Sequence, residues 1–260
     1  MSGSNKKAVI DAKHKKREIA LTKALGEVFR KKYPKGMIFC NKCPSRSSIF
    51  RNWWKNNFGE LCPPLQPEMD LIIWEPPNLT LAKDNEKLRA IEIKYFRKNN
   101  GKVNQSFYKG IEQSLAMLQW GFDSVALWQF FDESFSDFDL CSYGGRTWLY
   151  VHDRLNLPID YTIISVVDSV SSNPKFLIVQ PDWDNFPEIK WKREIEEFPV
   201  EWRKENPFRY PSNTELYSHP LLKKFVKEAN YLRNSIMNWL EIPGHSREYP
   251  NSMKNGKKNK

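Results

Sequence analysis

Three ionisable residues, Asp70, Glu92 and Lys94, lie within two strongly apolar runs of the chain. Side chains of a strand alternate between its two faces, so Glu92 and Lys94 point to the same side while Ile91 and Ile93 point into the core. Burying two carboxylates and a lysine costs free energy unless they find partners, such as a divalent cation and a phosphate group. A metal ion held by carboxylates is the usual requirement for cutting a phosphodiester bond. The three residues therefore indicate metal-dependent phosphodiester chemistry.

The elements that must position these residues can be read from the spacing of apolar side chains. Pro76 and Pro77 end the apolar run that contains Asp70, and Gly121 ends a later segment with helical spacing. The residues after that glycine are almost continuously apolar, as expected for a buried central strand. The spacing predicts, in order, a helix over 11–33, strands over 37–39, 69–75 and 88–96, a helix over 107–120 and a strand over 124–131.

This order of segments and residues resembles the PD-(D/E)XK nuclease superfamily, whose members share a restriction-endonuclease-like fold. The shared pattern is an aspartate, a spacer, Glu-X-Lys, and then a helix that carries a glutamine, here Gln113. The resemblance covers roughly residues 11–132, and the proline of the family's name stands at Pro67, three positions before Asp70. It implies an α/β fold: a mixed central sheet with an αβββαβ core, helices on both faces, and extra C-terminal strands and a helix.

The resemblance also implies a role for each residue of the pattern. Asp70 and Glu92 would hold Mg²⁺ or Mn²⁺, and the backbone carbonyl of Ile93 would be a further ligand. Lys94 would stabilise charge on the phosphate or orient the attacking water. Gln113 would contact the site or the DNA backbone, with an ordinary exposed helix residue as the alternative.

The first helix of such nucleases often adds a glutamate to the metal ligands, and two candidates lie in residues 11–33. Glu18 lies on the apolar face of this helix, whereas Glu27 lies beside lysines and suits a surface ion pair. We therefore expect Glu18 to join the metal. Glu68 alternates onto the same strand face as Asp70, where a charge at the rim of the site is a simpler role than a metal ligand.

The formal net charge of +10 favours an anionic partner, most simply DNA. Basic residues gather in the N-terminal helix, in a proline-containing insertion at about 41–68, and at the C-terminus. In the insertion they interleave with tryptophans, which suits phosphate contact with base stacking, although solvated charges and buried tryptophans are the alternatives. The residues expected to contact DNA are Lys16, Arg17, Arg46, Arg51, Tyr108 and Lys109.

Four cysteines are few for 260 residues and do not suggest a disulfide framework. Cys40 and Cys43 have half of a zinc-ribbon spacing, and Cys62 is a candidate third ligand. No second pair of cysteines or histidines follows, so we expect unpaired thiols. The four histidines show no metal-ligand spacing, which disfavours a histidine-dependent nuclease.

The chain is expected to form a nuclease-like domain over residues 1–180 and an extension over 181–242 that packs on it. Residues 243–260 are expected to be a disordered basic tail. Further predicted elements are a short helix over 48–57, a helix over 146–156, strands over 161–170 and 175–180, little regular structure over 181–218, and a helix over 221–240.

These observations predict a metal-dependent DNA endonuclease that hydrolyses phosphodiester bonds. Two alternatives are a non-catalytic nucleic-acid-binding protein that retains the fold, and an interaction protein whose basic charge is incidental. A homodimer is a further hypothesis, because cutting both DNA strands generally needs two active sites. The sequence has no apolar run of membrane-spanning length and a polar, basic N-terminus, so we expect a cytoplasmic protein that does not bind membranes.

Overall fold

The computed structural model of the chain describes residues 2–43, 48, 51–52, 55, 68–77, 86–103, 106–198, 200–209 and 220–245. A seven-stranded mixed sheet with helices packed against it confirms the predicted α/β class. Its strands are β1 (Met37–Lys42), β2 (Met69–Glu75), β3 (Lys87–Phe96), β6 (Ser124–Phe131), β7 (Asp160–Val167), β8 (Lys175–Pro181) and β9 (Ile189–Glu194). The main helices are α1 (Ser2–Lys32), α3 (Ile111–Gln119) and α7 (Pro220–Trp239).

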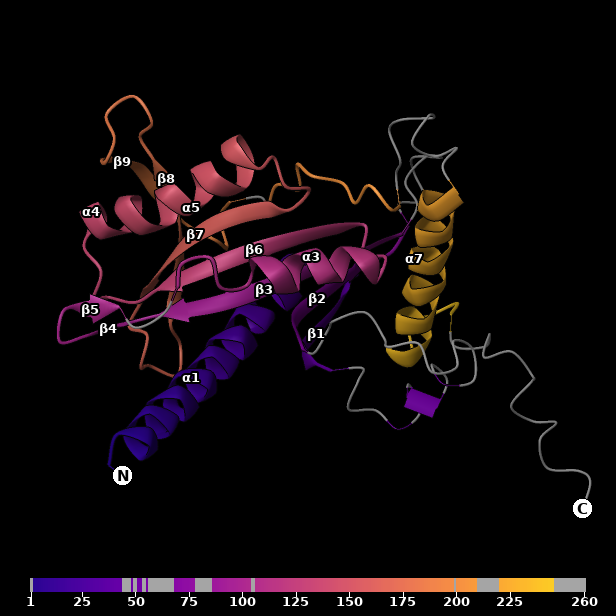
Figure 1. Cartoon of the computed structure of the whole chain (residues 1–260), viewed down its shortest axis with the longest axis horizontal. Coiled ribbons are helices and arrows are strands. Elements are labelled where there is room, and N and C mark those ends of the chain that lie inside the picture. Colours follow the sequence, from indigo (N-terminus) through magenta and orange to yellow (C-terminus); the bar gives the residue numbers. More distant parts are fainter. Residues whose placement is uncertain are drawn as a thin grey trace, which may run out of the picture.

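The strands lie in the order β1-β2-β3-β6-β7-β8-β9 (Figure 1). The three central strands β3, β6 and β7 are parallel, and the outer strands on both sides are antiparallel to their neighbours. Parallel neighbours need a crossover connection. Helix α3 connects β3 to β6, and a second helical segment connects β6 to β7. The carboxyl ends of β3 and β6 therefore meet at one edge of the sheet.

The sheet separates two apolar cores. On one side, Leu21, Leu25 and Phe29 of α1 are buried against β2 and β3, because they recur every four residues and so line one face of the helix. On the other side, α3 and α7 pack on the sheet through Met117, Ile236 and neighbouring apolar residues. Both faces of the central strands are thus buried, which explains their nearly continuous apolar sequence.

The predicted elements differ from the observed ones mainly at their ends. β2 and β6 have the predicted bounds, and β3 begins one residue earlier. The predicted helix over 107–120 begins only at Ile111, because Gly110 has a left-handed φ of 101° that a helix cannot continue. The predicted helix over 11–33 begins at Ser2.

Three further predictions need correction. No element was predicted between the strand over 88–96 and the helix over 107–120, but β4 (Lys98–Asn99) and β5 (Lys102–Val103) form a short hairpin there. The predicted helix over 146–156 is longer, and in it α4 (Asp137–Asp139) and α5 (Arg146–Trp148) alternate with π-helical turns. Residues 181–218 contain the edge strand β9, whose many charged side chains hide its apolar pattern. Most of the predicted helix over 48–57, and residues 246–260 of the predicted tail, lie outside the described residues.

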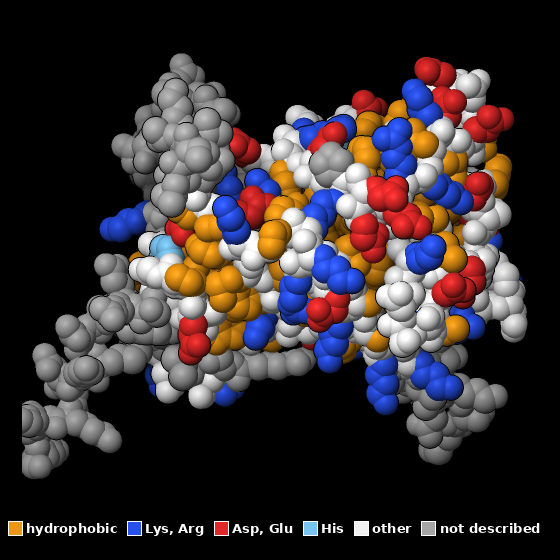
Figure 2. Space-filling view, turned by 180° about the vertical axis from the view of Figure 1, so that it is seen from behind, with side chains coloured by type: hydrophobic (Ala, Val, Ile, Leu, Met, Phe, Trp, Pro, Cys, Tyr) orange, Lys and Arg blue, Asp and Glu red, His pale blue; other side chains and the backbone are white. Residues whose placement is uncertain are grey.

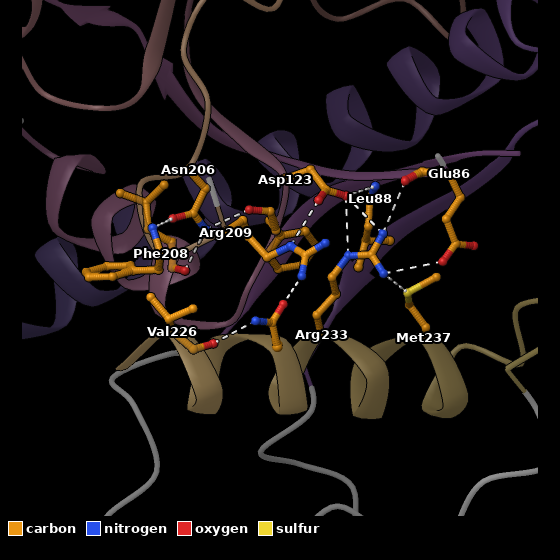
Figure 3. Close-up of polar contacts among 12 residues, drawn as sticks. Glu86, Leu88, Asp123, Asn206, Phe208, Arg209, Val226, Arg233 and Met237 are labelled. Atoms are coloured by element: carbon orange, nitrogen blue, oxygen red, sulfur yellow. Dashed lines mark hydrogen bonds and ion pairs between the residues drawn. The ribbon is translucent and has the colours of Figure 1, made fainter. Parts of the chain in front are cut away.

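A buried ion pair fastens α7 to the sheet (Figure 3). The Asp123 carboxylate accepts hydrogen bonds from Arg233 Nη2 at 3.0 Å and from the Leu88 amide at 2.7 Å. Arg209 Nε donates to its other oxygen at 3.1 Å. Burial would raise the pKa of Asp123, but Arg233 and the other donors hold it below the ordinary value. The carboxylate therefore remains charged and connects β3, the start of β6 and α7.

Two neighbouring contacts strengthen the same junction. The Asn206 side-chain amide donates to the carbonyl oxygens of Leu118 and Phe122, both at 2.7 Å (Figure 3). Gly121 has a φ of 78°, and an added Cβ there would overlap the backbone of Ala229 in α7. The glycine thus both ends α3 and allows α7 to approach closely.

Among the helices that the structure describes, none has the length and apolar character needed to cross a membrane.

Candidate active site

Strand β3 continues beyond the point where its partner β2 begins, so no described strand pairs with the last β3 amides on that edge. Two carboxylates take the place of the missing strand. Asp70 Oδ2 accepts a hydrogen bond from the Ile93 amide at 2.8 Å, and Glu18 Oε2 accepts one from the Tyr95 amide at 3.1 Å. The N–H and C=O groups of one strand residue point to the same edge, so the Ile93 carbonyl faces this side as well.

Glu92 and Lys94, which precede and follow Ile93 in β3, form a direct ion pair. Lys94 Nζ also lies 4.0 Å from Glu18 Oε1. Both members of the pair are buried, with side chains 1% exposed for Glu92 and 6% for Lys94. Only the side of β3 that carries Ile93 was expected to face a core. The other side, which carries Glu92 and Lys94 and faces α3, is buried as well. The structure therefore brings the two predicted carboxylates, the lysine and the predicted glutamate of α1 together.

The buried carboxylates repel one another. Burial raises the pKa of Asp70 to about 7, with a further contribution from Glu18, while Lys94 and the Ile93 amide act in the opposite direction. Burial and the charge of Asp70 raise the pKa of Glu92 well above its ordinary value. Burial alone would lower the pKa of Lys94, but Glu92, Glu18 and Asp70 raise it. The site thus holds excess negative charge and would gain from a further cation.

The side chains present suit a hard divalent cation. Both Glu92 oxygens are buried; Oε1 contacts the Lys94 ammonium, and Oε2 has no hydrogen-bond partner among the described residues. Carboxylate and carbonyl oxygens are the ligands that Mg²⁺ and Mn²⁺ prefer. Asp70, Glu92 and the Ile93 carbonyl would hold such an ion, with Glu18 beside them. Across the described ranges, however, no three His, Cys, Asp or Glu side chains are already clustered as a metal site, and the Lys94 ammonium lies between Glu92 and Glu18.

Lys94 is held in place from the side of α3. A Cβ added to Gly110 would lie 2.9 Å from Lys94 Cγ and 2.7 Å from Leu127 Cδ1, so the turn before α3 presses closely on the lysine. Gln129 lies opposite Lys94 in the parallel register of β3 and β6. Its amide donates to the Phe107 carbonyl at 2.6 Å, which ties the same turn to the sheet.

The remaining residues of the predicted site lie at different distances from this centre. Gln113 is partly buried on the first turn of α3, and no side-chain hydrogen bond joins it to another described residue. Glu27 is exposed and pairs with Arg30, as its surface role predicts. Glu68 pairs with Lys15 at 2.8 Å, and its charge contributes to the raised pKa of Asp70. Glu18 is therefore the glutamate of α1 that reaches the site.

The described residues expected to contact DNA lie on several separate segments of the chain. Lys16 is exposed on α1, and Arg17 beside it is partly buried. Tyr108, 55% exposed, and Lys109 lie in the turn before α3, close to Gly110. Arg51 is exposed, while Arg46 lies outside the described residues. On the face drawn in Figure 2, basic side chains are spread among acidic and apolar ones.

The cysteines give no support to a zinc ribbon. Cys40 is a free thiol, and burial raises its pKa, which disfavours the thiolate that zinc needs. Cys40 Sγ lies 3.8 Å from the Thr22 carbonyl of α1. Cys62 falls outside the described residues.

Sequence reasoning missed the residues that hold the site in shape. Gln129 is the one polar side chain in the buried interior of β6, and that isolation was a usable signal. Gly110 precedes α3 and was read as part of a helix. Tyr95 was given no role, although its hydroxyl donates to Asp132 Oδ2 at 2.8 Å. These roles depend on which residues meet in space.

No family model, curated protein or solved structure matches this chain.

Proposed function

We propose that the protein is a metal-dependent nuclease that hydrolyses phosphodiester bonds of DNA, with a restriction-endonuclease-like core. The observation that carries this proposal is the buried group of Asp70, Glu92 and Lys94, in which Glu92 Oε1 pairs with Lys94 and Glu92 Oε2 has no hydrogen-bond partner among the described residues. A purely structural site would satisfy such buried oxygens. The excess of carboxylates over cations supports Mg²⁺ or Mn²⁺ as the missing partner.

Each residue then has a task. A bound divalent ion would polarise the scissile phosphate and lower the pKa of a water molecule. Asp70 and Glu92 would hold that ion, and the Ile93 amide fixes the orientation of Asp70. The raised pKa of Lys94 keeps its amine protonated at neutral pH, so it serves as a positive charge beside the phosphate rather than as a base. Glu18 holds the ammonium between itself and Glu92.

Substrate contact is supported by the positions of basic and aromatic residues around this centre. Arg17 adjoins Glu18 in α1, and Tyr108 lies two residues before the glycine that presses on Lys94. The Tyr108 ring lies 4.8 Å from that of Tyr150, which is 37% exposed. An exposed aromatic pair beside the reactive group suits stacking with a base.

A second candidate is a non-catalytic nucleic-acid-binding protein. The observation in its favour is the direct contact of Lys94 with Glu92, because an internal ammonium partly neutralises the buried carboxylate without a metal. The two candidates differ in their need for a divalent ion. Only the nuclease should lose its activity in EDTA.

Cleavage of supercoiled, linear and branched DNA in Mg²⁺, Mn²⁺ or EDTA tests the proposal. We expect metal-dependent cleavage by the wild type and by Glu112→Gln, which changes an exposed carboxylate on α3. We expect no cleavage by Asp70→Asn or Glu92→Gln. Salt-dependent DNA binding without cleavage in either metal would select the second candidate.

A further inference from the structure

A basic pocket of about 390 Å³ lies beside the carboxylates, between α1 and the end of β3. Tyr95, which follows Lys94 and donates its amide to Glu18, forms one wall. The pocket therefore borders the candidate active site directly. The residues that line it are Lys13, His14, Arg17, Tyr95, Arg97, Asn99 and Val170.

Two residues that line this pocket carry side-chain nitrogens with no hydrogen-bond partner among the described residues. Arg17 Nε and Nη2 and His14 Nδ1 are buried, and none has a hydrogen-bond partner in the described part of the chain. Buried guanidinium nitrogens are costly to leave unpaired. Arg17 is a planar donor that suits an oxyanion with two oxygens in the same plane. The pocket therefore favours a charged oxygen ligand.

The charges around the pocket point to the kind of oxyanion. Lys13, Arg17 and Arg97 line it, whereas no carboxylate of the described residues does. Two acidic residues lie near these cations. Asp132 Oδ2 is 3.7 Å from Arg97 Nε, and the charge of Arg17 contributes to the lowered pKa of Glu133. Asp132 also accepts a hydrogen bond from the Tyr95 hydroxyl, and Glu133 accepts hydrogen bonds from Ser169. Both acids therefore already have neutral hydrogen-bond partners.

We propose that this pocket binds the terminal phosphate monoester of a nucleic-acid strand. Three cations suit a group that carries nearly two negative charges better than an internal phosphodiester, which carries one. The volume also exceeds that of a phosphate and leaves room for the attached sugar. This inference rests on the proposed nuclease function, because it assigns the pocket a part of the same substrate.

The test is binding of short labelled oligonucleotides in EDTA, with a phosphate at the 5′ end, at the 3′ end, or at neither. We expect the wild type to bind one phosphorylated strand roughly tenfold more tightly than the strand with hydroxyl ends, as for a charge-assisted hydrogen bond. The preferred end gives the polarity of the bound strand. Equal binding of all three strands would overturn the proposal.

Two variants and a control locate the effect. Arg17→Gln should abolish the preference, and Arg97→Gln, whose side chain is 56% exposed, should reduce it without disturbing the fold. Lys23→Gln changes an exposed charge on the same helix and should keep the preference. A preference that survives in both arginine variants, with folding verified by circular dichroism, would refute the assignment; if Arg17→Gln unfolds, Arg97→Gln still decides.

The outcome is separable from that of the nuclease proposal. Binding is measured without metal, whereas cleavage is measured on closed circular DNA, which has no terminal phosphate. A phosphate preference without cleavage would retain the pocket and reject the nuclease. Cleavage without a phosphate preference would support the nuclease and reject the assignment of the pocket.

Discussion

The Asp70 carboxylate accepts a hydrogen bond from the Ile93 amide at 2.8 Å, at the point where β3 runs on beyond β2. This contact fixes the carboxylate before any ligand arrives. The Ile93 carbonyl points to the same edge as the Ile93 amide, because both groups belong to one strand residue. A step between two neighbouring strands thus creates a preorganised oxygen site, which is what a cation with strict ligand geometry needs.

Glu92→Gln should stabilise the metal-free protein while removing its response to metal. The raised pKa of Glu92 means that burial and Asp70 outweigh the attraction of Lys94, so the charged form costs free energy in the folded state. We expect a higher Tm in EDTA, by roughly 2–4 °C for each kcal/mol recovered in a chain of this size. Mg²⁺ should raise the Tm of the wild type and of Glu112→Gln, but not that of Glu92→Gln. A metal-induced shift of wild-type size in Glu92→Gln would contradict the assigned ligand.

Gly110→Ala should impair cleavage more than folding. The added Cβ would lie 2.9 Å from Lys94 Cγ and must displace the lysine or the turn. Gly101→Ala is the matched control, because Gly101 also has a positive φ, 73°, but no atom lies within 4 Å of its added Cβ. We expect about 1 kcal/mol of backbone strain in both variants, a further stability loss in Gly110→Ala from the overlap with Leu127 and Lys94, and a lower cleavage rate only for Gly110→Ala. Equal rates for the two variants would show that the position of Lys94 does not matter.

Arg233→Met should unfold the junction between α7 and the sheet. Removing this guanidinium leaves the buried Asp123 carboxylate with fewer partners, and breaking such a pair typically costs about 3–5 kcal/mol. Lys227→Met removes an exposed charge from the same helix and should change stability by less than about 0.5 kcal/mol. Urea unfolding of both variants measures the difference. A small loss in Arg233→Met would mean that Arg209 alone satisfies Asp123.

Asp160 should make the protein less stable as pH rises. Burial raises the pKa of this carboxyl group to about 6, although the Lys204 and Arg203 amides donate to it. Because the folded-state pKa exceeds the unfolded value of about 3.9, the contribution is fully present below pH 4 and is lost as pH rises through 6. Asp160→Asn should therefore gain stability relative to the wild type between pH 4 and 7, by on the order of 2–3 kcal/mol.

Urea unfolding at pH 4.5 and pH 8 checks this expectation. Asp184→Asn serves as the control, because it removes a carboxyl group from an exposed position. A constant difference between Asp160→Asn and the wild type across this range would show that the carboxyl group does not titrate differently on folding.

Much of the core was predictable because the buried strands carry their own signal. Continuous apolar runs gave the bounds of β2 and β6, and the four-residue spacing of Leu21, Leu25 and Phe29 gave the buried face of α1. The edge strand β9 was missed because one side of it faces solvent and carries lysines and arginines. The late start of α3 was missed because the backbone of Gly110, not the apolar pattern, sets it.

The site was predictable only where residues are close in sequence. The spacing of Glu92 and Lys94 in one strand gave their common face, and the helical face of Glu18 favoured it over Glu27. The step between β2 and β3 depends on strand register, which one sequence does not reveal. The basic pocket likewise joins α1 to residues beyond position 95, and no local pattern connects them.

The central claim is that the buried carboxylates and Lys94 cut DNA with a divalent ion. Its most direct test is the single-turnover rate of cleavage of end-labelled DNA in Mg²⁺ by the wild type, Glu92→Gln and Lys94→Met, with DNA binding measured in EDTA for each. We predict cleavage by the wild type and rates lowered about 10²–10³-fold or more in both variants, with binding retained. No cleavage by the wild type in Mg²⁺ or Mn²⁺, or wild-type rates in both variants, would contradict the claim.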